Sequence, residues 1–239
     1  MATLIPSIGS CVSRMMPGEH RLAERLEQKL DIEYLFWYNL PLGPQRSQPD
    51  FMVLHPRRGL LILEVRDWDM KTIRRADLYN WQLFSNRMLT TRPNPIREAQ
   101  RYAQEIINAL KCDSQLLKSD GDLCFAWSYG VAFPNLTRQE FLQAQLGRFI
   151  EPQRALCSDE MLETIEAKDL QSRLWGMFPL MMGGLMTPAQ RERVRWILFP
   201  ELRLPSDAPF DSDVSTKLPA LMPVMDLQQE RLVRSATRK

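Results

Sequence analysis

The sequence predicts an α/β fold in which a central mixed β-sheet is flanked by helices, followed by a mainly helical C-terminal extension. Two strand-like runs, 50–55 and 60–68, enclose the turn-rich link 56–59, and this arrangement predicts a β-hairpin. Apolar residues recur at helical spacing before and after the hairpin. With 239 residues, 44% of them hydrophobic, the chain can form one good core and a smaller appended lobe.

The first helix is expected after Pro17 and Gly18. Glu19 lies three and four positions before the first apolar residues of this helix, so its side chain should follow the buried face. An acid in a first helical turn is also favourable by itself, and both interpretations of Glu19 stay open. The apolar face consists of Leu22, Ala23, Leu26 and Leu30.

The elements that follow alternate between strands and helices. A second hairpin is expected over 71–90, and a helix should begin at Asn94 with Pro95 in its first position. The apolar run 123–133 is typical of a buried central strand. Two further helices should begin at the capping residues Thr137 and Thr187.

Composition limits the classes of function. None of the four cysteines is spaced as in a zinc site, which favours reduced, structural thiols and a cytoplasmic protein. No signal peptide or apolar stretch of about 20 residues is present, so no membrane partner is expected. The chain has only two histidines, which disfavours paired-histidine chemistry; one of them, His55, should be exposed at a turn.

The net charge of +2 neither requires nor excludes a nucleic-acid partner. A DNA-binding surface would have to come from local clusters, and the candidates are Arg57 with Arg58 and Arg74 with Arg75. Such pairs are equally compatible with a solvated turn or strand edge.

The hairpin carries the candidate chemistry. Because side chains alternate along a strand, Glu64 and Arg66 extend a face that is otherwise apolar. If the loop comprises three residues, Asp50 lies directly opposite Glu64, with Cβ atoms roughly 4.5–5.5 Å apart. Two carboxylates at that distance repel by about 3 kcal/mol at an effective dielectric constant near 20. A divalent cation or Arg66 would offset this repulsion, whereas a one-residue slip would place the acids on opposite faces.

A metal ion at this position would suit nucleic-acid hydrolysis. Mg²⁺, or Mn²⁺ in its place, prefers carboxylate oxygens, can activate water and offsets charge on a phosphodiester. Arg66 would help to stabilise the charge that develops during attack. Glu19 could approach the same metal from the helix.

The motifs Gly18-Glu19, Pro49-Asp50-Phe51 and Glu64-Val65-Arg66-Asp67-Trp68 resemble the nuclease-related domain, NERD, of the PD-(D/E)xK nuclease superfamily. The resemblance covers roughly residues 15–110 and implies a restriction-endonuclease-like fold acting on DNA. It makes Glu19, Asp50 and Glu64 metal-side acids, Val65 a possible carbonyl ligand and Arg66 the catalytic cation. Gln100 is a weaker candidate for a polar residue near the site and could equally lie on a solvated helix edge.

Arg66 departs from the family pattern, which has lysine at this position. Arginine stays protonated and cannot act as a base, although it can stabilise phosphate charge. It could also hold Asp50 and Glu64 in a structural ion pair without any metal. The alternative to a nuclease is therefore a weakened or inactive module that binds DNA, a helicase or another protein. A protein-interaction scaffold with no nucleic-acid role is a third possibility.

The C-terminal part is similar to the region that joins NERD domains to UvrD-like superfamily-one helicases. The similarity rests on segments 129–131, 133–135 and 198–201, and residues 226–230 resemble the glutamine motif that precedes a helicase phosphate-binding loop. No such loop follows, so ATP hydrolysis is not expected. These features imply three parts: a NERD domain at 1–134, a helical extension at 135–199, and a Pro-rich linker with the start of a truncated helicase region at 200–239.

Overall fold

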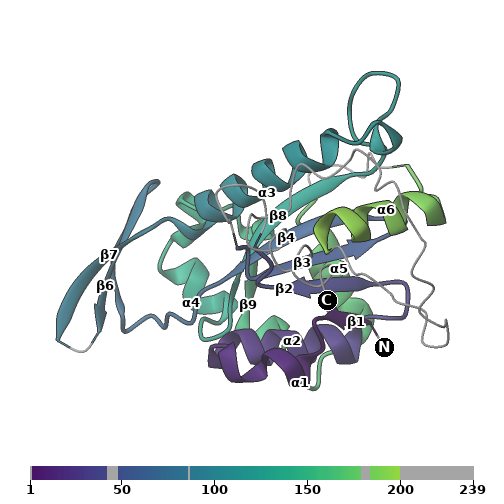
Figure 1. Ribbon diagram of the computed structural model, residues 1–239. Coiled ribbons are helices and arrows are strands. Elements are labelled where there is room, and N and C mark those ends of the chain that lie inside the picture. Colours follow the sequence, from purple (N-terminus) through teal and green to yellow (C-terminus); the bar gives the residue numbers. More distant parts are fainter. Residues whose placement is uncertain (1, 42–47, 86, 179–183, 200–239) are drawn as a thin grey trace, which may run out of the picture.

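The computed structural model describes residues 2–41, 48–85, 87–178 and 184–199. Its centre is a six-stranded mixed sheet in the order β1-β2-β3-β4-β8-β9 (Figure 1). Neighbouring strands pair in antiparallel fashion from β2 to β4 and in parallel fashion elsewhere. The strands are β1 (Thr3–Ile5), β2 (Leu35–Tyr38), β3 (Phe51–His55), β4 (Gly59–Val65), β8 (Trp127–Phe133) and β9 (Ala155–Cys157).

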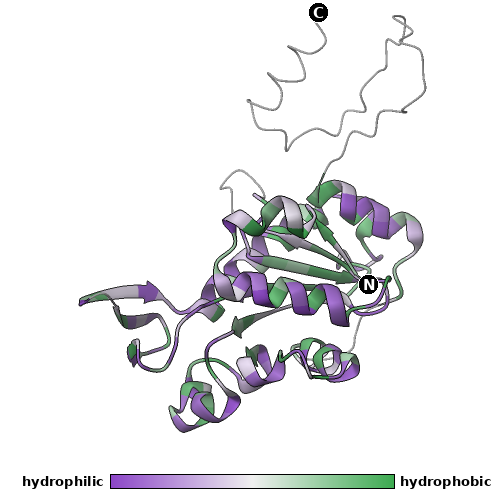
Figure 2. Cartoon of the chain, turned by 90° about the horizontal axis from the view of Figure 1, so that it is seen from below, coloured by the Kyte–Doolittle hydropathy of each residue, from purple (hydrophilic) through white to green (hydrophobic). Residues whose placement is uncertain are grey.

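Helices cover both faces of this sheet, as the predicted α/β fold requires. Helices α2 (Pro17–Lys29) and α5 (Ala167–Trp175) share one hydrophobic core with one face of the sheet. Helices α3 (Pro95–Lys111) and α6 (Pro188–Leu198) share a second core with the other face. The strands are largely hydrophobic and the helices amphipathic (Figure 2), because the central strands are buried on both faces.

Several predicted elements are confirmed. Helices begin after Met16, Asn94, Thr137 and Thr187, the third being α4 (Arg138–Gln143). The Asn94 side chain accepts a hydrogen bond from the backbone N–H of Ile96, as an N-cap should. At the hairpin turn, Gly59 has φ = 108°, and a Cβ atom there would lie 1.9 Å from the carbonyl oxygen of Ala126. This turn therefore requires glycine.

The segment 71–93 forms a second sheet rather than one hairpin. Strands β5 (Ile73–Ala76), β6 (Asn80–Ser85) and β7 (Met88–Pro93) pair in antiparallel fashion, and β6 and β7 extend away from the main sheet (Figure 1). Its anchor is Trp81, which is fully buried and stacks against Phe133.

The chain after residue 134 adds more than helices. Strand β9 pairs with β8 and extends the sheet, and short 3-10 helices lie between α4 and α5 in the chain. The short helix α1 (Ile8–Cys11) belongs to the N-terminal part and precedes α2. The expected linker and helicase-like start at 200–239 lie outside the described residues. Among the described helices, none combines the length and apolar character needed to cross a membrane.

Candidate active site

The register of the β3–β4 hairpin places Asp50 opposite Glu64. His55 pairs with Gly59, and the ladder continues to Phe51 opposite Leu63. Extending this ladder by one residue aligns Asp50 with Glu64, as the three-residue loop predicted. The side chain of Asp50 also crosses to β4, where its Oδ2 accepts a hydrogen bond of 2.7 Å from the backbone N–H of Val65. The hairpin itself thus fixes the Asp50 carboxyl group at the end of β4.

Three oxygens converge on the guanidinium group of Arg66. Its Nη1 donates to Glu64 Oε1 at 2.6 Å and to the Val65 carbonyl oxygen at 2.8 Å, and lies 3.6 Å from Asp50 Oδ2. These residues supply the oxygen donors that the sequence assigned to a metal. In this structure a positively charged nitrogen lies among them. A cation and Arg66 would therefore compete for the same oxygens.

Glu98 is a site residue that the sequence did not single out. It lies in the first turn of α3, and its Oε2 accepts a hydrogen bond of 2.6 Å from Arg66 Nη2. The available signal was an acid near a helix N-terminus, which helix electrostatics explains without any site. Only the packing of α3 beside β4 brings this carboxylate to Arg66.

Burial and mutual repulsion perturb the two central acids. Burial, together with the neighbouring Asp50 carboxylate, raises the pKa of Glu64 to about 9, against the opposing effect of Arg66. Burial also raises the pKa of Asp50, although its contact with Glu64 and the hydrogen bond from Val65 oppose that change. Glu64 therefore holds a proton near neutral pH while Asp50 accepts hydrogen bonds. The pair carries one negative charge beside the cation Arg66.

One oxygen of Glu64 provides a test of whether a metal fits. Glu64 Oε2 is buried and accepts no hydrogen bond from the residues that the structure describes. A buried carboxylate oxygen needs a partner, which can be a proton shared with Asp50 or a bound cation. Two carboxylates and a carbonyl form the kind of hard donor set that divalent Mg²⁺ or Mn²⁺ prefers. Asp50, Glu64 and Val65 thus fit such an ion.

Glu19 faces the same side of the sheet from α2. Its Oε2 accepts hydrogen bonds from the Met16 backbone N–H at 2.9 Å and from the Tyr38 hydroxyl group at 2.7 Å. Its charge also contributes to raising the pKa of Asp50, so the two carboxylates sense one another. Glu19 thus caps its helix, and its part in binding a metal ion stays a prediction.

The remaining candidate residues lie elsewhere. Gln100 is exposed on α3, two positions beyond Glu98. Arg57 and Arg58 lie in the β3–β4 turn, at the end of β4 opposite to Glu64; six residues of strand span roughly 20 Å. The other arginine pair, Arg74 and Arg75, is exposed on β5.

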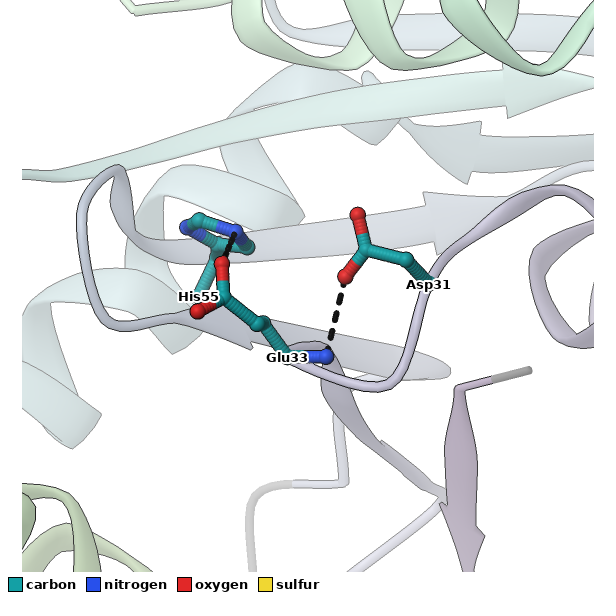
Figure 3. Close-up of side chains that lie close together, drawn as sticks. All are labelled: Asp31, Glu33 and His55. Carbon is teal, nitrogen blue, oxygen red and sulfur yellow. Dashed lines mark hydrogen bonds and ion pairs between the residues drawn. The ribbon is translucent and has the colours of Figure 1, made fainter.

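A second group of potential metal ligands lies near the hairpin turn (Figure 3). Asp31, Glu33 and His55 bring one ligand atom each within 4.8 Å of one another. The expectation of an exposed His55 is wrong: it is 5% exposed, because Tyr34 packs against its ring. Its Nδ1 accepts the Arg57 backbone N–H at 3.1 Å, so Nε2 carries the proton and lies 3.3 Å from Glu33 Oε2. Both ring nitrogens are engaged, which disfavours this group as a metal centre.

Comparison with known proteins identifies a known domain in this chain. Residues 14–131 match the family model described as the nuclease-related domain, NERD. No curated protein and no solved structure matches the chain. The matched range contains β2, β3, β4, the whole β5–β7 sheet and α3, and therefore every residue of the carboxylate cluster described above.

Proposed function

Residues 14–131 form a nuclease-related domain, and from this premise we propose that the chain is a metal-dependent nuclease that hydrolyses DNA phosphodiester bonds. The observation that carries the proposal is the convergence of Asp50, Glu64 and the Val65 carbonyl group at the end of β4. The buried Oε2 of Glu64, which accepts no hydrogen bond within the described part of the chain, supports it further.

We assign the ion-binding role to Asp50, Glu64 and the carbonyl oxygen of Val65, with Glu19 adding negative charge from α2. Bound Mg²⁺ or Mn²⁺ would supply an activated water and neutralise charge on the scissile phosphate. Glu64 must lose its proton for the full carboxylate set to form. The backbone N–H of Val65 donates to Asp50 Oδ2, which holds this carboxyl group at the end of β4.

Arg66 has the role of the positive side chain beside the phosphate. Its guanidinium group can form two hydrogen bonds to phosphate oxygens, as a planar fork does, but it cannot accept a proton. Glu98 holds Nη2 and keeps the guanidinium group near the cluster when Nη1 leaves the carboxylates. Arg66 therefore acts by charge stabilisation, and Glu98 acts as its positioning residue.

Cleavage of plasmid and linear DNA tests the proposal. The purified chain should cut DNA with Mg²⁺ or Mn²⁺ and lose this activity in EDTA, and Glu64→Ala should abolish it. Glu33→Ala, which alters the other acidic group, serves as the matched control and should cut normally. Equal inactivity of the wild-type and Glu64→Ala proteins, with unchanged DNA binding, would reject catalysis.

The rival function is a non-catalytic module that binds DNA or a protein partner. The contacts of Arg66 with Glu64 and Glu98, each at 2.6 Å, favour it, since this cation already offsets part of the negative charge of the acids. Arg66→Lys separates the two functions: gain of cleavage would identify a site weakened chiefly by arginine. Coupling to a UvrD-like helicase and cytoplasmic localisation stay predictions that rest on the sequence.

A further inference from the structure

In the chain, the β5–β7 sheet lies between two residues of the candidate active site. Arg66 precedes the insertion and Glu98 follows it, and their side chains join at 2.6 Å. The intervening chain leaves the end of β4, forms the sheet and returns to the start of α3 (Figure 1). The base of this sheet therefore lies beside the proposed site of hydrolysis, and a ligand bound along the sheet would extend towards that site.

The two faces of the sheet differ. On one face, Trp81 and Leu83 are buried and pack towards the domain. On the opposite face of β6 lie Gln82 and Phe84, and the ladder places Leu89 opposite Phe84. Phe84 is 40% exposed and Leu89 is 58% exposed. This outer face is therefore open and carries an accessible aromatic ring.

Arginines accompany the exposed aromatic rings. The guanidinium carbon of Arg74 lies 5.1 Å from the ring centroid of Phe84. At the base of the sheet, the guanidinium carbon of Arg97 lies 4.7 Å from the ring centroid of Tyr79, which is 62% exposed. Arg97 directly precedes Glu98. One pair of arginine and exposed aromatic side chain thus lies on the outer face of β6, and the other lies at the base of the sheet, next to Glu98 in the sequence.

Charge is concentrated in this insertion. Residues 71–93 contain five lysines and arginines and one acid, a net charge of +4. The remaining chain has 26 basic and 28 acidic residues, a net charge of −2, so the insertion changes the sign of the total. This polarity favours a polyanion over an apolar protein partner.

We infer that the β5–β7 sheet binds single-stranded nucleic acid along its outer face and at its base, with bases stacking on Phe84 and Tyr79 and the phosphates contacting the adjacent arginines. The inference rests on the proposed function in taking nucleic acid as the ligand of the domain. Exposed rings beside cations are the features that recognise unstacked bases. Bases in a duplex are already stacked on one another, so they have no free face for stacking on an aromatic side chain.

Fluorescence anisotropy with a labelled 20-nucleotide strand, in EDTA, tests this surface apart from cleavage. Phe84→Leu and Tyr79→Leu should each weaken binding about 10-fold, and together about 100-fold, because leucine keeps apolar area but cannot stack. Phe84→Tyr should bind within about twofold of wild type. Trp196→Leu, which removes a half-exposed aromatic on α6, is the matched control and should have no effect. Thermal unfolding confirms that each variant is folded.

Two results would overturn the inference: duplex binding as tight as single-strand binding, or unchanged single-strand affinity in the Phe84→Leu/Tyr79→Leu protein. The first result would assign the sheet to duplex backbone, and the second would leave it without a stacking role. Loss of cleavage in Glu64→Ala with retained strand binding supports both proposals. If the protein binds single-stranded nucleic acid through these rings but does not cleave DNA, only the proposed nuclease activity is refuted.

Discussion

The protonated state of Glu64 makes metal binding depend steeply on pH. Because burial and Asp50 raise its pKa to about 9, a divalent ion must displace a proton at neutral pH. About 1% of Glu64 is ionised at pH 7, so the apparent affinity there should be about 100-fold below its limit at high pH. Between pH 6 and pH 8 the dissociation constant should fall about 10-fold per pH unit.

Isothermal titration with Mn²⁺ across pH 6.0–8.5 measures this dependence. Repeating the titration in buffers of different ionisation enthalpy counts the protons released, and about one per ion is expected at pH 7. Asp50→Asn is an informative companion, because removing the repelling carboxylate should lower the pKa of Glu64 and flatten the pH profile. A wild-type dissociation constant that is constant over this range, with no proton release, would refute the assignment of the proton to Glu64.

Three further predictions concern stability. Glu64→Gln replaces the carboxyl group by a neutral isostere and should raise the melting temperature. The pKa of Glu64 is higher in the folded than in the unfolded protein, so the stability of the wild type falls as the pH rises from about 4.5 towards 9. The gain should be about 1 kcal/mol at pH 5 and about 5 kcal/mol at pH 8, and an equal gain at both would contradict the reasoning. Tyr38→Phe removes the hydroxyl donor to Glu19 and should cost about 1–2 kcal/mol in denaturant unfolding. Gly18→Ala places a Cβ atom 1.6 Å from Asp67 Oδ1 and should lower the free energy of unfolding by about 2 kcal/mol or more. Adding Asp67→Ala should recover part of that loss of stability, and no recovery would argue against the clash.

Local patterns were sufficient to predict the hairpin and its register. Strand alternation and the turn-forming residues 56–59 are properties of neighbouring residues, so the alignment of Asp50 with Glu64 followed from counting outward from a three-residue loop. Helix starts at Asn94 and Thr187 were equally predictable, since a cap acts on its own first turn.

Short or distant elements were not predictable in the same way. Strands β1 and β9 have three residues each, too few to show a periodicity, and their pairing depends on the sheet that is already present. His55 was expected to be exposed because turns usually are, yet Tyr34 and Trp175 cover it from other parts of the chain. Residue type and position in a turn carry no information about such coverage.

The sequence by itself determined that two acids and an arginine lie near one end of a hairpin, and it aligned Asp50 with Glu64 on the condition of a three-residue loop. Tertiary structure alone decided how these charges are balanced. The packing of α3 beside β4 brings Glu98 to Arg66, and the packing of α2 beside β2 joins Glu19 to Tyr38. Contacts of this kind join residues that are far apart in the chain, and their energies depend on burial, which no local pattern of residues encodes.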